Sequence, residues 1–201
     1  FARIKTPVAT TKYRTENGFY QIRQWCLDEV NGKNPDPFKI FINGGAGTGK
    51  SHLIKCLSYE ANKILSPHAP NPDDIVVLIT APTATAAFNI GGTTLHQAFS
   101  LSKSLPFPYI YKRDDEINKL RAKLQNLQIL IIDEISMVGQ RVLLYISERL
   151  RQIKQSGNAL FGNICVIAVG DFYQLPPVKQ KCLYDLRPEH FFPLWSLNFS
   201  L

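Results

Sequence analysis

The sequence predicts an α/β domain built on a parallel β-sheet with helices on both faces. Four short apolar runs have the composition of strands that are buried on both sides: 38–43, 75–80, 129–133 and 164–171. Five segments with apolar residues at helical spacing lie around these runs: 20–30, 50–65, 83–90, 113–127 and 140–154. Because strands that alternate with helices form βαβ units, we expect the four strands to run parallel in one sheet.

The composition fits one folded domain and leaves the kind of partner open. Of the 201 residues, 45% are hydrophobic and 19% are charged, which favours a packed core over disorder. The net charge of +7 is compatible with a polyanionic partner, but ordinary basic solubility explains it equally well. No apolar run approaches the length of a membrane span, so we expect no membrane partner.

The four cysteines lie far apart and form no CxxC pair: Cys26, Cys56, Cys165 and Cys182. This spacing argues against a zinc ribbon and a disulfide framework, and it favours a reducing compartment. Cys165 lies inside an apolar run and is interpreted as a small core residue. The chain starts at Phe1 and not at a methionine, so we expect a fragment or a processed chain.

The strongest chemical signal is the segment GGAGTGKS, which fits the pattern G-x-x-x-x-G-K-[ST] between an expected strand and an expected helix. Its glycines let backbone N–H groups turn toward phosphate oxygens, and the next helix directs its positive end at them. Lys50 is expected to reach the β- and γ-phosphates, and the Ser51 hydroxyl to ligate Mg²⁺. The alternative is a chance glycine turn. The predicted nucleotide-binding residues are Gly44, Gly45, Ala46, Gly47, Thr48, Gly49, Lys50 and Ser51.

Two acidic residues follow the third expected strand, in the segment ILIIDEIS. Asp133 stands where P-loop enzymes hold Mg²⁺ with a carboxylate, and Glu134 is placed to act as general base on the attacking water. An adjacent Asp-Glu pair separates ATPases from most GTPases, and the chain has no N-K-x-D guanine-reading signature. The alternative is a pair of solvated carboxylates without chemistry. ATP and Mg²⁺ are therefore the expected substrate and cofactor.

The last apolar run leads into the segment GDFYQLPPV, which sets one glutamine between an acid and two prolines. The carboxyl ends of parallel strands face the ligand crevice, so Asp171 is expected near the γ-phosphate. The amide of Gln174 can hydrogen-bond the γ-phosphate or the attacking water, and Pro176 and Pro177 limit its movement. Taken alone, the segment is better explained as a proline-rich turn with a surface glutamine. Beside the other two motifs, a γ-phosphate sensor is the better interpretation.

Four segments resemble, in this order, the motifs of the Pif-type (petite integration frequency) superfamily-one DNA helicases, especially those of Helitron-type mobile elements: GGAGTGKS, TAPTATAAFNIGGTTLH, LIIDEISMV and AVGDFYQLPPV. The resemblance runs from about Gln21 to Val178. It implies a RecA-like P-loop NTPase domain and an ATP-driven helicase that moves 5′ to 3′ along single-stranded DNA and opens duplex junctions. It also implies a monomer in the nucleus, with the mitochondrion as a second location.

The resemblance also implies a division of the chain. Residues 1–37 would be a lead-in with a helix in which Gln21 resembles the glutamine that reads adenine, although Gln24 competes for this role. Residues 38–201 would form the first motor domain, with the second motor domain absent. Since the second domain supplies an arginine finger and the partner for opening and closing, we expect this chain alone to hydrolyse ATP poorly and not to translocate.

The segment 80–99 corresponds to the single-strand DNA contacts of the resembled family. Threonine hydroxyls and backbone N–H groups there can bind DNA phosphates, and a glycine pair permits close approach of the backbone. His96 and Phe99 can stack on bases, although a lone histidine is often a packing residue. The loop 101–113 mixes aromatic and basic side chains, as strand-binding surfaces do, but a mobile solvated loop explains it as well. The predicted DNA-binding residues are Pro82, Thr83, Thr94, His96, Phe99 and Lys103.

Two other functions compete with the helicase. A protein-remodelling P-loop ATPase that never touches DNA shares the first two nucleotide motifs, but we do not expect it to carry GDFYQLPP. A catalytically inert, DNA-binding relic of a mobile element is disfavoured because the predicted catalytic set is intact: Lys50, Ser51, Asp133, Glu134 and Gln174.

Overall fold

A five-stranded, fully parallel sheet forms the centre of the protein, in the spatial order β1-β5-β4-β2-β3. The computed structural model describes residues 11–178 and 180–183 of the chain, with side chains from residue 18 onward. The strands are β1 (Lys39–Asn43), β2 (Val77–Ala81), β3 (Thr93–Thr94), β4 (Ile129–Ile132) and β5 (Cys165–Gly170). The predicted parallel sheet is confirmed, with one short strand, β3, added at its edge.

Six α-helices within the described residues connect or flank these strands: α1 (Thr11–Val30), α2 (Lys50–Leu65), α3 (Ala84–Ile90), α4 (Leu95–Ala98), α5 (Asp114–Leu124) and α6 (Gln140–Lys154). In the same part of the chain, three short 3₁₀ helices complete the connections: η1 (Ser66–His68), η2 (Ile135–Met137) and η3 (Leu160–Asn163). None of the helices in the described part of the chain is both long enough and apolar enough to cross a membrane.

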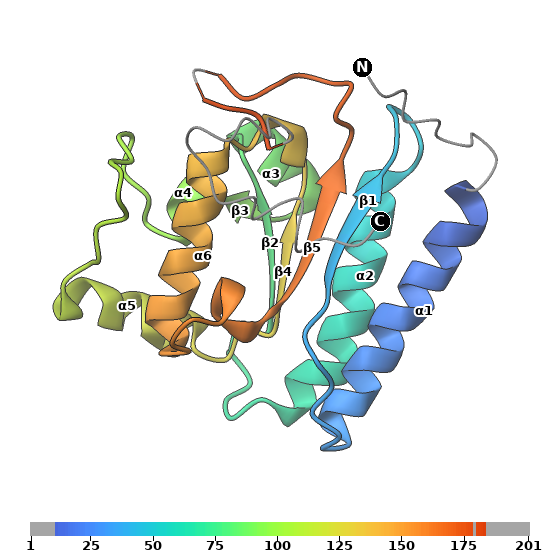
Figure 1. The fold of residues 1–201 in the computed structure, drawn as a ribbon. Helices are drawn as coiled ribbons and strands as arrows, with labels where there is room; N and C mark the ends of the chain where they lie inside the picture. Colours follow the sequence, from blue (N-terminus) through green and yellow to red (C-terminus); the bar gives the residue numbers. More distant parts are fainter. Residues whose placement is uncertain (1–10, 179, 184–201) are drawn as a thin grey trace.

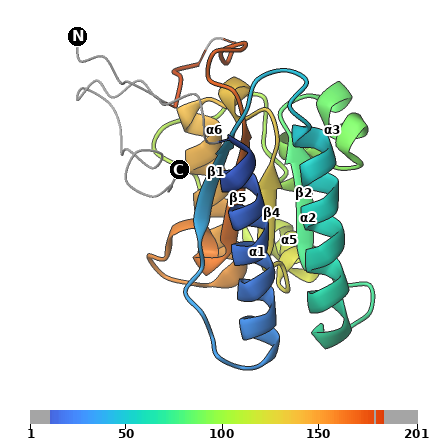
Figure 2. The ribbon, with the colours of Figure 1, turned by 90° about the vertical axis from the view of Figure 1, so that its right-hand side faces the viewer.

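Helices cover both faces of the sheet, as Figure 1 shows: α1 and α2 lie on one side, and α5 and α6 lie on the other. Figure 2, seen at right angles, shows α1 and α2 side by side along the sheet. Alternate residues of a buried strand point to opposite faces, so each face has its own core. In β5, Val166 and Ala168 join the core under α5 and α6, whereas Cys165 and Ile167 join the core under α1 and α2. Cys165 is fully buried, which confirms its prediction as a core residue.

The strand register brings the carboxyl ends of three strands together. β5 lies between β1 and β4, with Asn43 opposite Gly170 and Ile132 opposite Ala168. The loop after β1 is also joined to the end of β5, because the N–H of Gly44 donates to the carbonyl oxygen of Gly170 at 3.1 Å. The loops that carry the predicted phosphate-binding, acidic and sensor residues therefore start from neighbouring points on one edge of the sheet.

Several boundaries differ from those expected. α1 begins at Thr11 and not at residue 20, and α5 ends at Leu124 and not at residue 127. α5 ends early because the following backbone turns to the sheet, where the N–H groups of Gln128 and Ile129 both donate to the carbonyl oxygen of Val76. β3 and α4 are too short to show a period of apolar residues, so no sequence pattern marks them.

The predicted lead-in, residues 1–37, packs onto the sheet where the structure describes it. Ile22 and Cys26 of α1 are buried in the same core cluster as Ile54 and Leu57 of α2. α1 therefore shares a core with the RecA-like domain. Residues 1–10 of this lead-in, and residues 179 and 184–201 of the predicted motor domain, lie outside the described residues.

Candidate nucleotide-binding site

The loop between β1 and α2 has the conformation that a phosphate-binding loop requires. Gly47 and Gly49 have φ angles of 72° and 86°, in the left-handed region that glycine adopts without steric cost. Gly49 is the N-cap of α2, and its carbonyl oxygen already accepts a hydrogen bond from the N–H of Leu53. The positive end of α2 therefore lies at the loop, where it favours a bound anion.

The ammonium of Lys50 folds back onto this loop. Its Nζ donates to the carbonyl oxygens of Gly44 and Gly45 at 2.7 Å and 2.8 Å. Thr48 Oγ1 also donates to the carbonyl oxygen of Gly45, at 2.9 Å. Phosphate oxygens of a nucleotide would take the place of these carbonyl oxygens as partners of the cation. Ser51, in the first turn of α2, is exposed to a ligand at the same place.

Asp133 and Glu134 stand directly after β4. The N–H of Asp133 donates to the carbonyl oxygen of Thr80 at 2.8 Å, which extends the pairing with β2 beyond the strand. The Asp133 side chain is 4% exposed, and its Oδ1 accepts a hydrogen bond from the N–H of Glu134 at 2.9 Å. Glu134 has a φ angle of 49°, which is uncommon for a residue other than glycine. This turn leads the chain into η2 and sets the two neighbouring carboxylates on a fixed backbone.

Burial raises the pKa of both carboxyl groups. For Asp133, desolvation raises the pKa, while the N–H of Glu134 and the positive charge of Lys50 lower it. For Glu134, desolvation also dominates, and the negative charges of Asp133 and Asp171 raise the pKa further, against the lowering effect of Lys50. The strand register and the hydrogen bond from Gly44 to Gly170 place the loop of the lysine and the turns of the three acids at one edge of the sheet, where their charges interact.

Asp171 organises the turn after β5; the sequence predicted its place near the γ-phosphate but not this role in the turn. It is 9% exposed, and its Oδ1 accepts a hydrogen bond from the N–H of Tyr173 at 3.0 Å. Its carbonyl oxygen accepts a hydrogen bond from the N–H of Gln174, also at 3.0 Å. Its Oδ2 lies 4.0 Å from the point where a Cβ on Gly45 would stand. An aspartate that bonds a backbone N–H two residues later is a known turn pattern, and that pattern could have identified it.

Gln174 lies in this turn, and its side chain is partly exposed. β5 is flanked by β1 and β4, so its backbone emerges between the loop of Lys50 and the turn of Asp133. The placement is compatible with contact to a γ-phosphate. The sensor role of its amide stays a prediction.

A magnesium ion fits the residues present only together with a nucleotide. The described residues contain no group of three or more His, Cys, Asp and Glu side chains that could hold a metal alone. Mg²⁺ commonly takes one or two protein ligands, with phosphate oxygens and water completing an octahedron. The exposed hydroxyl of Ser51 and the buried carboxylate of Asp133 suit that arrangement.

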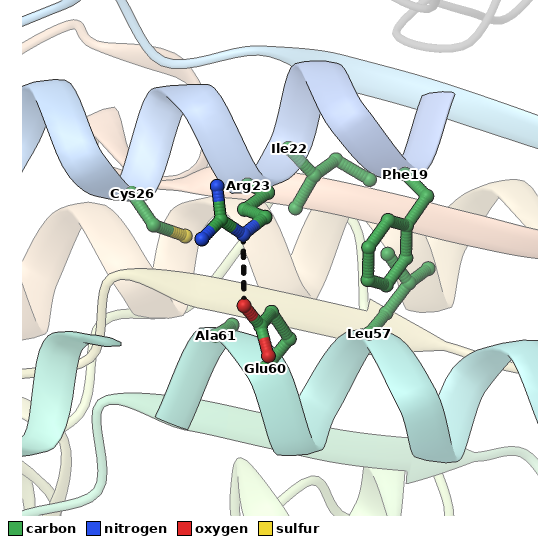
Figure 3. Close-up of a pocket in the computed structure, with 7 residues that line it drawn as sticks. All are labelled: Phe19, Ile22, Arg23, Cys26, Leu57, Glu60 and Ala61. Carbon is green, nitrogen blue, oxygen red and sulfur yellow. Dashed lines mark hydrogen bonds and ion pairs between the residues drawn. The ribbon is translucent and has the colours of Figure 1, made fainter. Parts of the chain in front are cut away.

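The glutamine predicted to read adenine lies on the exposed side of α1. Gln21 is exposed, and its competitor Gln24 is also exposed, with Nε2 donating to Asp28 Oδ1 at 3.0 Å. The opposite side of α1 packs on α2, as Figure 3 shows, where Arg23 Nε donates to Glu60 Oε1 at 2.9 Å. Apolar side chains fill the rest of this junction: Phe19, Ile22, Cys26, Leu57 and Ala61. The adenine-reading role of Gln21 remains a prediction.

Three of the predicted DNA-binding residues lie at the carboxyl ends of β2 and β3. Pro82 and Thr83 follow β2, and Thr83 Oγ1 caps α3 by accepting the N–H of Ala86 at 3.2 Å. Thr94 ends β3 and caps α4, where its Oγ1 accepts the N–H of Gln97 at 3.2 Å. Both hydroxyls therefore also stabilise the structure as helix caps. His96, on α4, is partly exposed, and Lys103, in the following loop, is exposed.

The expected base-stacking role of Phe99 is wrong in this structure. Its side chain is 0% exposed and belongs to the core between the sheet, α5 and α6. The apolar ring follows α4 inward, since the N–H of Phe99 donates to the carbonyl oxygen of Leu95 and continues the helical turn. A ring that is fully buried cannot stack on a DNA base.

Comparison with known proteins agrees with this geometry. A family model described as "PIF1-like helicase" matches residues 21–188. The ATP-dependent DNA helicase PIF1 of Emericella nidulans is 38% identical over 143 residues, which cover 70% of this chain and 18% of the relative. The ATP-dependent DNA helicase PIF1 of Homo sapiens is 39% identical over 142 residues, which cover 70% of this chain and 20% of the relative. The chain thus spans about a fifth of the length of these relatives.

A solved structure shows the same architecture. The Pif1 helicase from Bacteroides, in complex with ADP-AlF3 and ssDNA, matches with a TM-score of 0.56 and 33% sequence identity. The match covers 78% of this chain and 33% of that chain. The predicted RecA-like fold is confirmed by this likeness together with the parallel sheet.

Proposed function

The chain belongs to the PIF1-like helicase family, and from that premise we propose that it forms an ATP-hydrolysing motor domain of an ATP-dependent DNA helicase. The observation that carries the proposal is the convergence of three strand ends on one charged site. Lys50 follows β1, Asp133 and Glu134 follow β4, and Asp171 follows β5. This arrangement offers a cation to phosphates and carboxylates to a metal and a water molecule.

In the proposed mechanism, the residues after the three strands bind the phosphates, hold the metal and accept a proton. Backbone N–H groups of the loop 44–51 bind the phosphates of ATP, and Lys50 exchanges its carbonyl partners for the β- and γ-phosphate oxygens. Ser51 and Asp133 would hold Mg²⁺, which would supply positive charge beside the transferred phosphoryl group. Glu134 accepts a proton from the attacking water, and burial helps because it raises the pKa of that carboxyl group toward neutrality.

The proposed sensor and DNA contacts link hydrolysis to movement. Gln174 bonds the γ-phosphate and loses that bond after hydrolysis. Pro82, Thr83, Thr94, His96 and Lys103 form the DNA-binding face at the ends of β2 and β3, near the nucleotide edge of the same sheet. The solved Bacteroides Pif1 complex with ADP-AlF3 and ssDNA supports pairing these two ligands in one motor. We assign 5′ to 3′ movement on single-stranded DNA and opening of duplex junctions to the whole protein.

Three finer assignments belong to the same proposal. We assign adenine recognition to Gln21, a monomeric state to the chain, and a nuclear location, with a mitochondrial one as the alternative. The resemblance to helicases of Helitron-type elements supports a role in DNA mobilisation. Sedimentation tests the oligomeric state, and imaging of the tagged protein tests the cellular location.

The proposal is tested by the ATPase rate of a protein extended to the length of its relatives, with and without single-stranded DNA. A helicase motor shows a rate that single-stranded DNA stimulates. A rate that is indifferent to DNA would favour the protein-remodelling ATPase, and the absence of any rate would favour an inert DNA-binding relic. Glu134→Gln, which keeps the size of the side chain but removes the base, must abolish the stimulated rate.

A further inference from the structure

The loop that carries Gln174 is attached to the protein at both of its ends. Figure 1 shows this loop, at the red end of the colour bar, rising above the sheet after β5 and returning to the upper end of α6. Its first attachment is the turn at Asp171, described above. Its second attachment is at Gln140, the first residue of α6.

Gln140 holds the returning end of the loop with two hydrogen bonds. Its backbone N–H donates to the carbonyl oxygen of Lys181 at 3.1 Å, and its side-chain Nε2 donates to the carbonyl oxygen of Cys182 at 2.8 Å. The first N–H groups of a helix have no hydrogen-bond partner inside the helix. The carbonyl oxygen of Lys181 in the loop therefore supplies the partner for the N–H of Gln140. Leu183, the next residue, is 4% exposed and joins the core beneath α6.

The contact at this end is close enough to require glycine. A Cβ on Gly139, the N-cap residue of α6, would lie 2.6 Å from the Cβ of Gln180. The side chain of Gln180 therefore lies directly against the start of α6. A displacement of the loop end would therefore also displace the first turn of α6.

The first turn of α6 is also tied to the catalytic acids. Only η2 and Val138 separate Glu134 from Gly139. η2 itself rests on the end of β5, since a Cβ on Gly170 would lie 3.0 Å from the backbone nitrogen of Ile135. The turn of the acids and the far end of the sensor loop are thus joined through η2, Val138 and Gly139.

Two prolines restrict the backbone shortly after Gln174. Pro176 and Pro177 fix the φ angle of two of the residues between Gln174 and Lys181. Pro177 is buried, while Leu175 and Val178 are 68% and 77% exposed. A loop that is attached at both ends holds Gln174 in place better than a loop attached at one end alone.

We propose that Gln140 is a positioning residue that fixes the γ-phosphate sensor loop to the start of α6. It touches no reacting atom. It restricts the turn that carries Gln174 and couples the position of that turn to α6 and the acids. The inference rests on the proposed function, because it takes Gln174 as the group that distinguishes ATP from ADP.

The test compares the affinities for ADP and for the non-hydrolysable imido analogue of ATP, measured by calorimetry with Mg²⁺ present. Gln140→Met has a side chain of similar length that cannot donate a hydrogen bond. It should reduce the preference for the ATP analogue over ADP by about three- to tenfold, the range expected for one net hydrogen bond. The affinity for ADP itself should stay unchanged.

A matched control lies on the same helix. Gln152 donates from Nε2 to the carbonyl oxygen of Lys112 at 2.7 Å and so fixes a different loop. Gln152→Met removes this bond, and also the bonds that Oε1 accepts from Tyr109 and from the N–H of Lys112, and it should leave the preference unchanged. Gln140→Lys restores a donor at this position and should recover the preference in part.

The outcomes separate the inference from the proposed function. If Gln174→Ala removes the preference while Gln140→Met keeps it, the sensor stands and the role of Gln140 is wrong. If Gln140→Met weakens both nucleotides equally, its role is merely structural and the inference fails. If neither Gln174→Ala nor Gln140→Met changes the preference, the sensor assignment in the proposed function is itself wrong.

A measurement on the unmodified chain covers the case in which Gln140→Met does not fold. Hydrogen exchange at the amide of Gln140 reports the bond to Lys181 directly. The ATP analogue should slow this exchange relative to ADP. Equal exchange with the two nucleotides would overturn the inference.

Discussion

Lys50 donates a hydrogen bond from its ammonium to the carbonyl oxygen of Gly44 at 2.7 Å, so the cation is held by the loop that precedes it. A second bond, to Gly45, completes this arrangement at 2.8 Å. The charge thus stands inside the phosphate-binding loop. A preorganised cation needs little rearrangement when charge develops on a phosphoryl group.

We expect Lys50→Ala to lower the ATPase rate of the extended protein by about 10²- to 10³-fold, the loss typical of removing one preorganised donor. Binding of ATP should weaken, and the melting temperature without nucleotide should change little. Steady-state hydrolysis and calorimetry measure these effects. Lys55→Ala, at an exposed position of the same helix, is the control and should leave both unchanged. A normal rate for Lys50→Ala would remove this lysine from the mechanism.

Asp133→Asn should stabilise the nucleotide-free chain at neutral pH while it abolishes hydrolysis. Burial raises the pKa of Asp133, so the folded state binds a proton more readily than the unfolded state. Stability is therefore lost as the pH rises from the unfolded value of about 3.9 through the folded pKa. Asparagine does not ionise, so the folded chain loses no stability by burying a charge at this position. Its side-chain oxygen can still accept the N–H of Glu134.

Thermal unfolding at several pH values checks this effect. The melting temperature of Asp133→Asn should exceed that of the unchanged chain by a few degrees at pH 7, and the gap should close near pH 4. Asp73→Asn, at an exposed position, should show no such pattern. A gap that stays constant with pH would mean that ionisation of Asp133 is not its cause.

Sequence patterns predicted the parts of the fold that depend on local composition. The runs that became β1, β2, β4 and β5 are apolar because both faces of the sheet are covered, and the spacing around Lys50 is fixed by the shape of a phosphate. Contacts between distant segments left no such pattern. Gln140 and Cys182 are 42 positions apart, and nothing in either segment indicates that they meet.

Phe99 shows a different limit. An aromatic residue near a histidine and a lysine has the composition of a strand-binding surface, whichever way its ring points. The direction is decided by α4, whose single turn carries the ring into the core. A helix of four residues is too short for its buried side to be read from a periodic pattern.

Phe99→Ala should destabilise the chain by about 3–5 kcal/mol, as expected for a large core side chain. Phe88 is the matched control, because it is 85% exposed on the neighbouring helix α3. Phe88→Ala should change the free energy of unfolding by about 0.5 kcal/mol or less. Denaturant titrations measure both. Equal effects of the two substitutions would contradict the burial of Phe99.

Gly92→Ala should disturb the predicted DNA-binding face. A Cβ at Gly92 would lie 2.5 Å from the carbonyl oxygen of Ile79 in β2, so β3 would have to move away from the sheet. We expect a loss of about 1–3 kcal/mol in stability and weaker binding of single-stranded DNA. Gly91 has open space around it but a φ angle of 69°. Gly91→Asn, which tolerates that conformation, should be nearly neutral. A neutral Gly92→Ala would show that β3 is not closely packed.

The convergence of three strand ends on one metal–nucleotide site is tested most directly by paramagnetic broadening. Mn²⁺ replaces Mg²⁺ with the ATP analogue in the isotope-labelled chain, and amide signals are compared before and after. The account predicts strong broadening for Ser51, Glu134 and Gln174, which follow β1, β4 and β5, and none for Gly157 near the opposite edge of the sheet. Broadening that affects Ser51 but spares Glu134 and Gln174 would contradict it.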